Sequence, residues 1–157
     1  MVRCTSTPRF SSITVSVILS QTDTTVGFLS QNAQKLYEIK SRKTSKPFIK
    51  VYFDFKSFLT CGNRVPPMMT NLVRRSKKTT FIIKDRAFRV AKSSLSSQIL
   101  REYTWYFSTS ANEEGKNFDR VFCVTKADII VEDKYGLREN ASSSLIKINN
   151  VKRRKIR

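Results

Sequence analysis

Apolar residues along this chain fall into short runs that alternate between the period of a strand and the period of a helix. Residues 16–19 form a β-branched apolar run that predicts a buried strand. Polar residues 21–25 follow, and Gly27 then allows a tight bend. Ser30 is expected to cap a helix over residues 33–40, where apolar side chains recur at helical spacing. The opening of the chain therefore predicts a strand, a turn and a helix.

The rest of the chain continues this mixture. Residues 48–53 alternate and predict a strand, and Asp54 is a candidate cap for a short helix after it. A break at Pro66 and Pro67 precedes a predicted helix over residues 68–75. Further strands are predicted over residues 79–83, 87–90, 105–107, 128–131 and 145–148, and a further helix over 95–103. The fold class expected from this order is α/β, with some antiparallel pairing.

Length and composition indicate one domain. The chain has 157 residues, of which 39% are apolar and 27% charged, so it can bury a substantial core. We expect a single domain over residues 1–157, with residues 1–12 flexible and residues 150–157 forming a basic tail. No apolar run approaches the roughly 20 residues needed to cross a bilayer. A cytoplasmic protein with no membrane partner is expected.

The residue types that are missing exclude several kinds of chemistry. The chain contains no His, which excludes Ser/His/Asp and Cys/His nucleophilic catalysis and any imidazole base. Its three cysteines, Cys4, Cys61 and Cys123, are far apart, so neither a disulfide framework nor a zinc cluster is indicated. No metal site is predicted. Any reaction must depend on charge and on the positioning of substrates.

Positive charge dominates the composition. Lys and Arg number 30 against 12 Asp and Glu, a net charge of +18. Such an excess favours a polyanionic partner: a nucleotide, RNA or anionic lipid. Nine cations and one acid fall within residues 64–92, and six more cations follow from Lys147. A solvated surface is the plain explanation, and a phosphate backbone is the alternative. The candidate RNA-binding residues are Arg74, Arg75, Lys77 and Lys78.

Two polar segments could form a site. Thr22, Asp23, Thr24 and Thr25 follow the first strand directly, and a second hydroxyl-rich segment, residues 108–112, follows the strand at 105–107. Each could be an ordinary capping turn, because such residues bond their own backbone. Two cations, Lys40 and Arg42, leave the predicted helix close together, which suits either a solvated helix end or a bound anion.

Three blocks of this sequence resemble the family of threonylcarbamoyl-adenylate synthases, the Sua5/YciO/YrdC family. Residues 21–28 match its opening motif Pro-Thr-Asp-Thr-Val-Tyr-Gly-Leu, and residues 40–48 match Lys-x-Arg followed by Lys-Pro-Leu. Residues 110–115 match Ser-Ala-Asn-x-x-Gly. More loosely, Arg89 matches the arginine of Val-Arg-x-Pro, and residues 142–146 match Ser-Thr-Val-Val-Asp. The resemblance covers about residues 15–148.

This resemblance implies a fold and an activity. The fold would be a single YrdC-like α/β domain, a twisted open mixed β-sheet flanked by helices with a concave, positively charged face. The activity would be that of an L-threonylcarbamoyladenylate synthase, a nucleotidyltransferase that makes threonylcarbamoyl-AMP and pyrophosphate from L-threonine, bicarbonate and ATP for t6A modification of tRNA. Mg²⁺ is expected to enter with ATP. The proteins that transfer the threonylcarbamoyl group to tRNA are candidate partners.

Site residues follow from the same resemblance. Lys40 and Arg42 would grip the triphosphate and serve as the catalytic cations. The ATP site as a whole would comprise Lys40, Arg42, Lys46, Ser110 and Asn112. The L-threonine site would comprise Thr22, Arg89 and Ser143, with Arg89 paired to the carboxylate of the amino acid.

The sequence also departs from the family pattern. Gln21 stands in place of Pro, Thr25 and Val26 in place of Val-Tyr, and Lys147 in place of Asp. Two alternatives therefore stay open. One is a non-catalytic YrdC-like protein that binds tRNA or double-stranded RNA through its basic face. The other is an enzyme of the same fold that uses a different carbamoyl acceptor.

Overall fold

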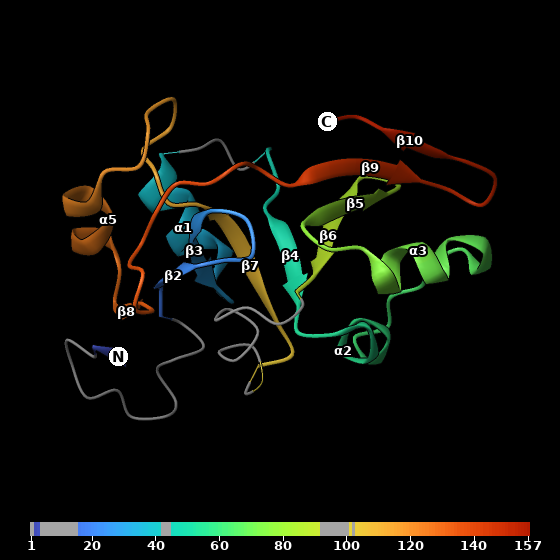
Figure 1. Cartoon of the computed structure of the whole chain (residues 1–157), viewed down its shortest axis with the longest axis horizontal. Helices are drawn as coiled ribbons and strands as arrows, with labels where there is room; N and C mark the ends of the chain where they lie inside the picture. The colour runs from blue at the N-terminus through green and yellow to red at the C-terminus, as the bar shows by residue number, and fades with distance from the viewer. Residues whose placement is uncertain (1, 4–15, 42–44, 92–100, 102) are drawn as a thin grey trace.

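A computed structural model of the chain describes residues 2–3, 16–41, 45–91, 101 and 103–157. Within these ranges ten strands form one mixed sheet in the order β1-β8-β2-β3-β7-β4-β6-β5-β9-β10, which Figure 1 shows running across the molecule. The strands are β1 (Val2–Arg3), β2 (Ile18–Gln21), β3 (Val26–Ser30), β4 (Ile49–Tyr52), β5 (Thr79–Ile83), β6 (Arg86–Val90), β7 (Trp105–Ser110), β8 (Ile129–Val131), β9 (Ser144–Ile148) and β10 (Arg153–Lys155). The helices are α1 (Ala33–Lys40), α2 (Phe55–Thr60), α3 (Thr70–Arg75), α5 (Arg120–Lys126) and the 3-10 helix η2 (Pro67–Met69).

Strand register sorts the sheet residues into two faces, because side chains alternate along a strand and paired residues share a face. Leu19 pairs with Phe28, and both join an apolar cluster with α1 and α5. Tyr52 lies in a second cluster with α2 and α3. The four α-helices that the structure describes thus pack on one face, the helix face. Val51, which neighbours Tyr52 and pairs with Arg89, lies on the opposite face, which we call the site face.

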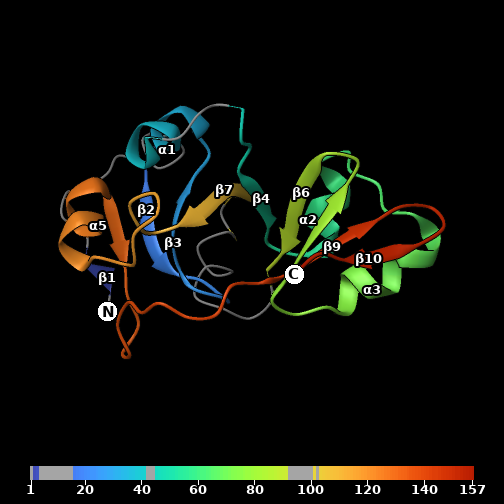
Figure 2. The ribbon, with the colours of Figure 1, turned by 90° about the horizontal axis from the view of Figure 1, so that it is seen from above.

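Each pair of helices covers its own half of the sheet, as Figure 2 shows from above. In one half, Leu36 of α1 and Cys123 of α5 pack against Phe28. In the other, Phe58 of α2 and Val73 of α3 pack with the residues of β4, β5 and β6. Burial of these side chains supplies the main driving force for folding in both halves.

Charge divides along the same boundary. The half made of β1, β8, β2, β3 and β7 with α1 and α5 contains residues 2–3, 16–41 and 103–139, which carry eight cations and nine acids, a net charge of −1. The half made of β4, β6, β5, β9 and β10 with α2 and α3 contains residues 45–91 and 140–157, which carry 17 cations and two acids, a net charge of +15. We call them the acidic half and the basic half. They meet where β7 pairs with β4.

Much of the expected secondary structure is confirmed. The α/β class is confirmed. The predicted strands are also confirmed, with ends that shift by up to three residues: 16–19, 48–53, 79–83, 87–90, 105–107, 128–131 and 145–148. Asp54 caps α2 as predicted, because its carboxylate accepts a hydrogen bond from the backbone N–H of Ser57 at 2.6 Å. The predicted helix over 95–103 falls mostly on residues outside the described ranges.

Two predictions near the start of the chain were wrong. Gly27 lies inside strand β3 rather than in a bend, because residues 22–25 close a hairpin between β2 and β3. Ser30 ends that strand, and Asn32 caps α1 instead, with its side-chain oxygen accepting from the N–H of Gln34 at 3.0 Å. The sequence prediction also missed α5, β1 and β10.

Candidate functional site

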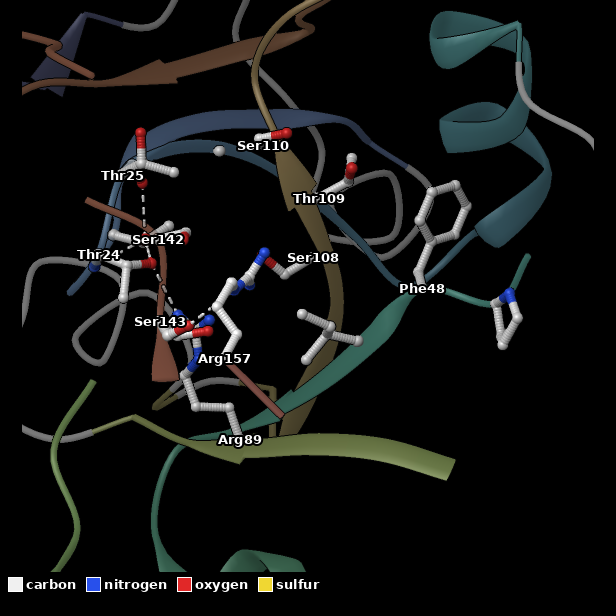
Figure 3. A pocket seen from close by; sticks show the side chains of 14 residues that line it. Thr24, Thr25, Phe48, Arg89, Ser108, Thr109, Ser110, Ser142, Ser143 and Arg157 are labelled. Atoms are coloured by element: carbon white, nitrogen blue, oxygen red, sulfur yellow. Dashed lines mark hydrogen bonds between the residues drawn. The ribbon is translucent and has the colours of Figure 1, made fainter. Parts of the chain in front are cut away.

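A cavity of about 290 Å³ lies at the boundary between the two halves. Ile49 of β4, Arg89 of β6 and Ser108 of β7 line it from the site face, and the turn after β2 and the segment before β9 complete the wall (Figure 3). Two arginines, Arg89 and Arg157, contribute its positive charge. Eight lining residues carry hydroxyl groups: Thr22, Thr24, Thr25, Ser108, Thr109, Ser110, Ser142 and Ser143. The cavity suits a small polar ligand that carries negative charge.

The floor of the cavity requires a glycine. A Cβ atom on Gly27 would lie 3.0 Å from the carbonyl oxygen of Thr109 and 3.2 Å from Cγ2 of Thr22. Both neighbours are close, and the first is backbone that pairs with β3. Any larger residue would displace the wall, so Gly27 is needed for close approach and not for backbone freedom.

The turn after β2 is built by Thr22. Its hydroxyl donates to the carbonyl of Thr25 at 2.6 Å and accepts from the backbone N–H of Thr24 at 3.2 Å. This geometry is that of a capping turn, and it places Thr22 on the cavity wall at the same time. The expected contact between Thr22 and L-threonine stays a prediction. With its proton used inside the turn, the Thr22 oxygen would serve a ligand as an acceptor.

Arg89 is buried and makes four hydrogen bonds. Its Nη1 donates to a carboxylate oxygen of Asp23 and to the hydroxyl of Thr24, each at 2.9 Å. Its Nε and Nη2 donate to the hydroxyl of Thr80 at 3.2 and 3.0 Å, and that hydroxyl lies 2.9 Å from the hydroxyl of Ser143. Arg89 thus connects the predicted threonine-binding residues into one network. A guanidinium has five N–H donors, so one remains for a ligand.

The pair formed by Arg89 and Asp23 crosses the boundary between the halves. The side chains are only 8% and 12% exposed, so both charges are largely removed from water. The resemblance implied a ligand carboxylate as the partner of Arg89, and the structure shows that Asp23 already provides one carboxylate there. Pairing of Arg89 with L-threonine stays a prediction.

Arg157 is a cavity residue that the sequence did not reveal. Its backbone carbonyl accepts from the N–H of Leu145 at 2.9 Å, which extends the pairing of β9 and β10 and fixes the residue beside the cavity. Its Nε donates to the carbonyl of Ser143 at 3.3 Å, and its side chain extends into the cavity (Figure 3). Arg157 forms no ion pair with the carboxylates that the structure describes. Its terminal nitrogens can therefore bind an anion.

A second group of predicted residues meets at the end of β7. The ammonium of Lys40, at the end of α1, donates to the carbonyls of Ser110 and Asn112 and, at 2.7 Å, to the side-chain oxygen of Asn112. Ser110 donates to the same side-chain oxygen at 2.7 Å and also lines the cavity. The structure thus brings Lys40, Ser110 and Asn112 together, as the two motifs implied. Their contact with ATP stays a prediction.

The remaining predicted residues lie away from the cavity or outside the described ranges. Arg42 belongs to residues 42–44, which the structure does not describe. Lys46 is largely exposed, and its ammonium lies 4.0 Å from a carboxylate oxygen of Glu114. The four candidate RNA-binding residues are all exposed and do not line the cavity: Arg74, Arg75, Lys77 and Lys78.

Cys123 and Lys50 are among the described titratable groups with altered pKa values, and neither lines the cavity. Burial raises the pKa of the Cys123 thiol to about 11, and the thiol donates to the carbonyl of Ala111 at 3.2 Å. Burial also lowers the pKa of Lys50, whose ammonium lies 3.7 Å from the centre of the Trp105 ring. Both groups belong to the packing of the helix face.

No group of three or more Cys, Asp or Glu side chains in the described part of the chain could hold a metal ion. Among the described helices, none has the length and apolar character needed to span a bilayer.

Solved structures share this fold. The chain superposes on a double variant of P. abyssi Sua5 with a TM-score of 0.75 and 17% identity, covering 94% of this chain and 51% of that one. On P. abyssi Sua5 complexed with L-threonine the TM-score is 0.72 at 14% identity, with 90% and 50% covered. On E. coli YciO it is 0.71 at 15% identity, with 94% and 85% covered.

These similarities confirm the expected YrdC-like fold. The chain spans about half the length of the Sua5 structures that it matches. No family model matches the sequence, and no curated protein matches it at the sequence level.

Proposed function

We propose that the chain is an L-threonylcarbamoyladenylate synthase of the Sua5/YciO/YrdC family, which converts L-threonine, bicarbonate and ATP to threonylcarbamoyl-AMP and pyrophosphate. The observation that carries the proposal is the common cavity of Thr22, Arg89 and Ser143, which come from three distant segments of the chain. A Sua5 protein of the same fold has been solved with L-threonine. The size of the cavity, about 290 Å³, suits an amino acid better than a whole nucleotide.

In this proposal each cavity residue binds a different group of the ligand. The hydroxyls of Thr22 and Ser143 read the side chain of L-threonine. Arg89 has one remaining donor for the carboxylate, while Arg157 supplies a full charge for an anionic group of either substrate. ATP then extends from the cavity along Ser110 towards Lys40, where the two predicted sites adjoin.

The reaction that follows needs alignment and charge neutralisation. The amine of L-threonine reacts with bicarbonate to give a carbamate and water. A carbamate oxygen then attacks the α-phosphorus, the bond to the bridging oxygen breaks, and pyrophosphate leaves with its electron pair. Negative charge accumulates on phosphate oxygens in that step, so the cations around the cavity stabilise it. Mg²⁺ carried by ATP would supply additional positive charge.

The test is threonine-dependent release of pyrophosphate from ATP and bicarbonate. We expect release with L-threonine and much less with L-valine, because a site that bonds a hydroxyl is left with unpaired polar groups by a ligand that lacks it. Equal release with both amino acids would contradict recognition of the threonine side chain by the hydroxyls of Thr22 and Ser143. Release that requires another amine and not L-threonine would favour the alternative carbamoyl acceptor.

A matched pair of variants tests the role of the cavity cation. Arg157→Ala should lower catalytic efficiency about thirtyfold or more, since a desolvated charged group of the ligand loses its partner. Arg153→Ala, in the same hairpin and likewise exposed but outside the cavity, should leave the efficiency within about twofold of wild type. An equal loss in both would show that overall charge, and not the cavity, is responsible.

A second candidate function is non-catalytic binding of tRNA or double-stranded RNA. The net charge of +15 on the basic half favours it, because one nucleotide needs only a few cations. The exposed cluster Arg74, Arg75, Lys77 and Lys78 is the candidate contact surface. Binding of RNA without threonine-dependent pyrophosphate release would support this function over the first.

A further inference from the structure

A second, larger cavity of about 640 Å³ lies in the basic half and shares no lining residue with the first. The loop after α2, the turn between β5 and β6, and the turn after β9 surround it. The motifs that resemble the Sua5/YciO/YrdC family do not account for this cavity. Its volume is sufficient for a large side chain of a bound ligand together with part of a backbone.

The floor of this cavity is apolar and rigid. Phe58 and Phe88 form it, with ring centres 4.5 Å apart in a stacked arrangement, and Ile83 adds an aliphatic wall. The loop above the floor is held by Asn63, whose side-chain nitrogen donates to the Tyr52 hydroxyl at 3.0 Å and to the Phe58 carbonyl at 2.9 Å. A ligand would therefore meet a surface that is already formed, and binding would cost little ordering of the protein.

Three cations surround the opening. Arg64, Lys84 and Arg86 line the cavity and are exposed, and none of them forms an ion pair with a carboxylate in the described part of the chain. Asp85 lies between two of them in the sequence, so the local net charge of these four residues is +2. A ligand that carries several carboxylates or phosphates would complement this rim.

Large apolar side chains are exposed beside the cavity residues. Met68 is 78% exposed and follows the lining residue Pro67, and Leu59 is 44% exposed and follows Phe58. Exposed methionine and leucine next to a preformed groove are typical of surfaces that bind protein segments. A nucleotide would satisfy the three cations and fill the cavity, but it would gain nothing from covering these aliphatic groups.

We propose that this second cavity binds an acidic segment of a partner protein. One large apolar side chain of that segment enters the cavity and packs on Phe58 and Phe88. Carboxylates on either side of it pair with Arg64, Lys84 and Arg86, and the adjoining backbone covers Leu59 and Met68. This site is independent of the proposed synthase activity, because it shares no residue with the first cavity.

A titration of the isotope-labelled full chain followed by NMR tests the proposal. The probe is the peptide Asp-Glu-Phe-Glu-Asp, compared with the same peptide carrying Ala in place of Phe and with uridine monophosphate. We expect the Phe peptide to shift the amide signals of Gly62, Asn63, Lys84 and Asn150. The Ala peptide should bind about tenfold more weakly, because the buried phenyl group is lost.

Two variants and a control locate the binding. Arg64→Glu with Arg86→Glu should weaken the Phe peptide about tenfold or more, whereas Lys77→Glu with Lys78→Glu changes the net charge equally and should weaken it less than about twofold. Val65→Trp fills the cavity without changing charge and should abolish the difference between the Phe and Ala peptides.

Several results would overturn the proposal. Equal weakening by the two charge reversals would mean that the peptide responds only to overall charge. Shifts of the same amides by uridine monophosphate, with weaker shifts by the Phe peptide, would assign the cavity to a nucleotide. No shifts at millimolar peptide would exclude a docking site for this class of segment. Threonine-dependent pyrophosphate release in each variant reports separately on the synthase proposal.

Discussion

The two halves of this molecule have the same construction and opposite charge balances. In the part of the chain that the structure describes, each half contributes five strands and two α-helices on the same face of one sheet, and each buries one apolar cluster under its helices. Yet the acidic half carries a net charge of −1 and the basic half +15. Since similar cores support both halves, the excess charge is not required by the fold.

The first cavity draws on both halves. The acidic half provides the turn of Thr22 and the hydroxyls at the end of β7, groups that orient a ligand without adding charge. The basic half provides Arg89 and Arg157, which supply the charge. The two halves therefore differ in what they offer a ligand. The acidic half offers hydroxyl groups that can orient the ligand, and the basic half offers cations that can neutralise an anion.

The largest expected effect comes from breaking the ion pair that joins the halves. Arg89→Met should destabilise the fold by about 3–5 kcal/mol, because it leaves the largely buried carboxylate of Asp23 without its partner. Urea unfolding measures the loss. Combining Arg89→Met with Asp23→Asn should restore part of the stability, since no charge is then left unpaired. A loss below about 1 kcal/mol for the single variant would show that the pair is effectively solvated.

A buried cation of the acidic half should affect activity next most strongly. Lys40→Ala, like Arg42→Ala, should lower threonine-dependent pyrophosphate release about a hundredfold, which corresponds to about 3 kcal/mol. Lys35→Ala on the same helix is the control, because its ammonium is partly exposed and 3.5 Å from Asp128. If Lys40→Ala kept wild-type activity and nucleotide affinity, the prediction would be wrong, and the role of Lys40 would be only to hold the turn that contains Ser110.

The difference in net charge between the two halves should affect how tRNA affinity depends on salt. Reversing Arg74, Arg75, Lys77 and Lys78 to Glu should flatten the dependence of tRNA affinity on salt, because each neutralised phosphate contributes a slope of about −0.7 to −0.9. Four lost contacts would change the slope by about three units. A filter-binding titration across salt measures it.

The matched control for this reversal lies in the acidic half. Reversing the same number of cations there, at Lys116, Lys126, Lys134 and Arg138, should leave most of the slope intact. An equal change in both variants would mean that RNA responds to net charge alone and would remove the basic half from a specific role.

The smallest expected effect concerns an ion pair on the surface of the acidic half. Arg120 donates to the two carboxylate oxygens of Glu132 at 2.7 and 3.0 Å, but its side chain is 54% exposed. Arg120→Ala should therefore cost less than about 1 kcal/mol of unfolding free energy, and less still at high salt. A cost equal to that of Arg89→Met would show that burial does not set the difference between the two pairs.

Sequence patterns predicted those helices and strands whose apolar periodicity and capping residues match the way they pack in the structure. The strand at 48–53 and the cap at Asp54 are of this kind. Strand β3 was missed because Gly27 resembles a bend, and only its pairing with both β2 and β7 makes it a strand. Strand β10 was missed because three consecutive cations resemble a solvated tail, and pairing with β9 holds them in place.

Sequence motifs predicted which residues would lie together, but they did not predict the contacts that these residues make with one another. The motifs implied Thr22, Arg89 and Ser143 as one group, and the structure places all three around one cavity. The contact of Arg89 with Asp23 and the entry of Arg157 depend on which strands are neighbours in the sheet, which no local pattern encodes. A turn signal was present for Arg157, since the Asn149-Asn150 pair separates β9 from β10.

The order of strands in the sheet has a consequence for how the chain folds. Residues 79–83 of β5 pair in parallel with residues 144–148 of β9, and the cavity wall combines Thr22 with Ser143 and Arg157. Contacts of such long sequence separation raise the contact order, so we expect this chain to fold more slowly than a helical bundle of the same length. The cavity forms only when the distant segments have met. Local pairings such as β5 with β6 therefore cannot create the cavity by themselves, and ligand binding becomes a measure of complete folding.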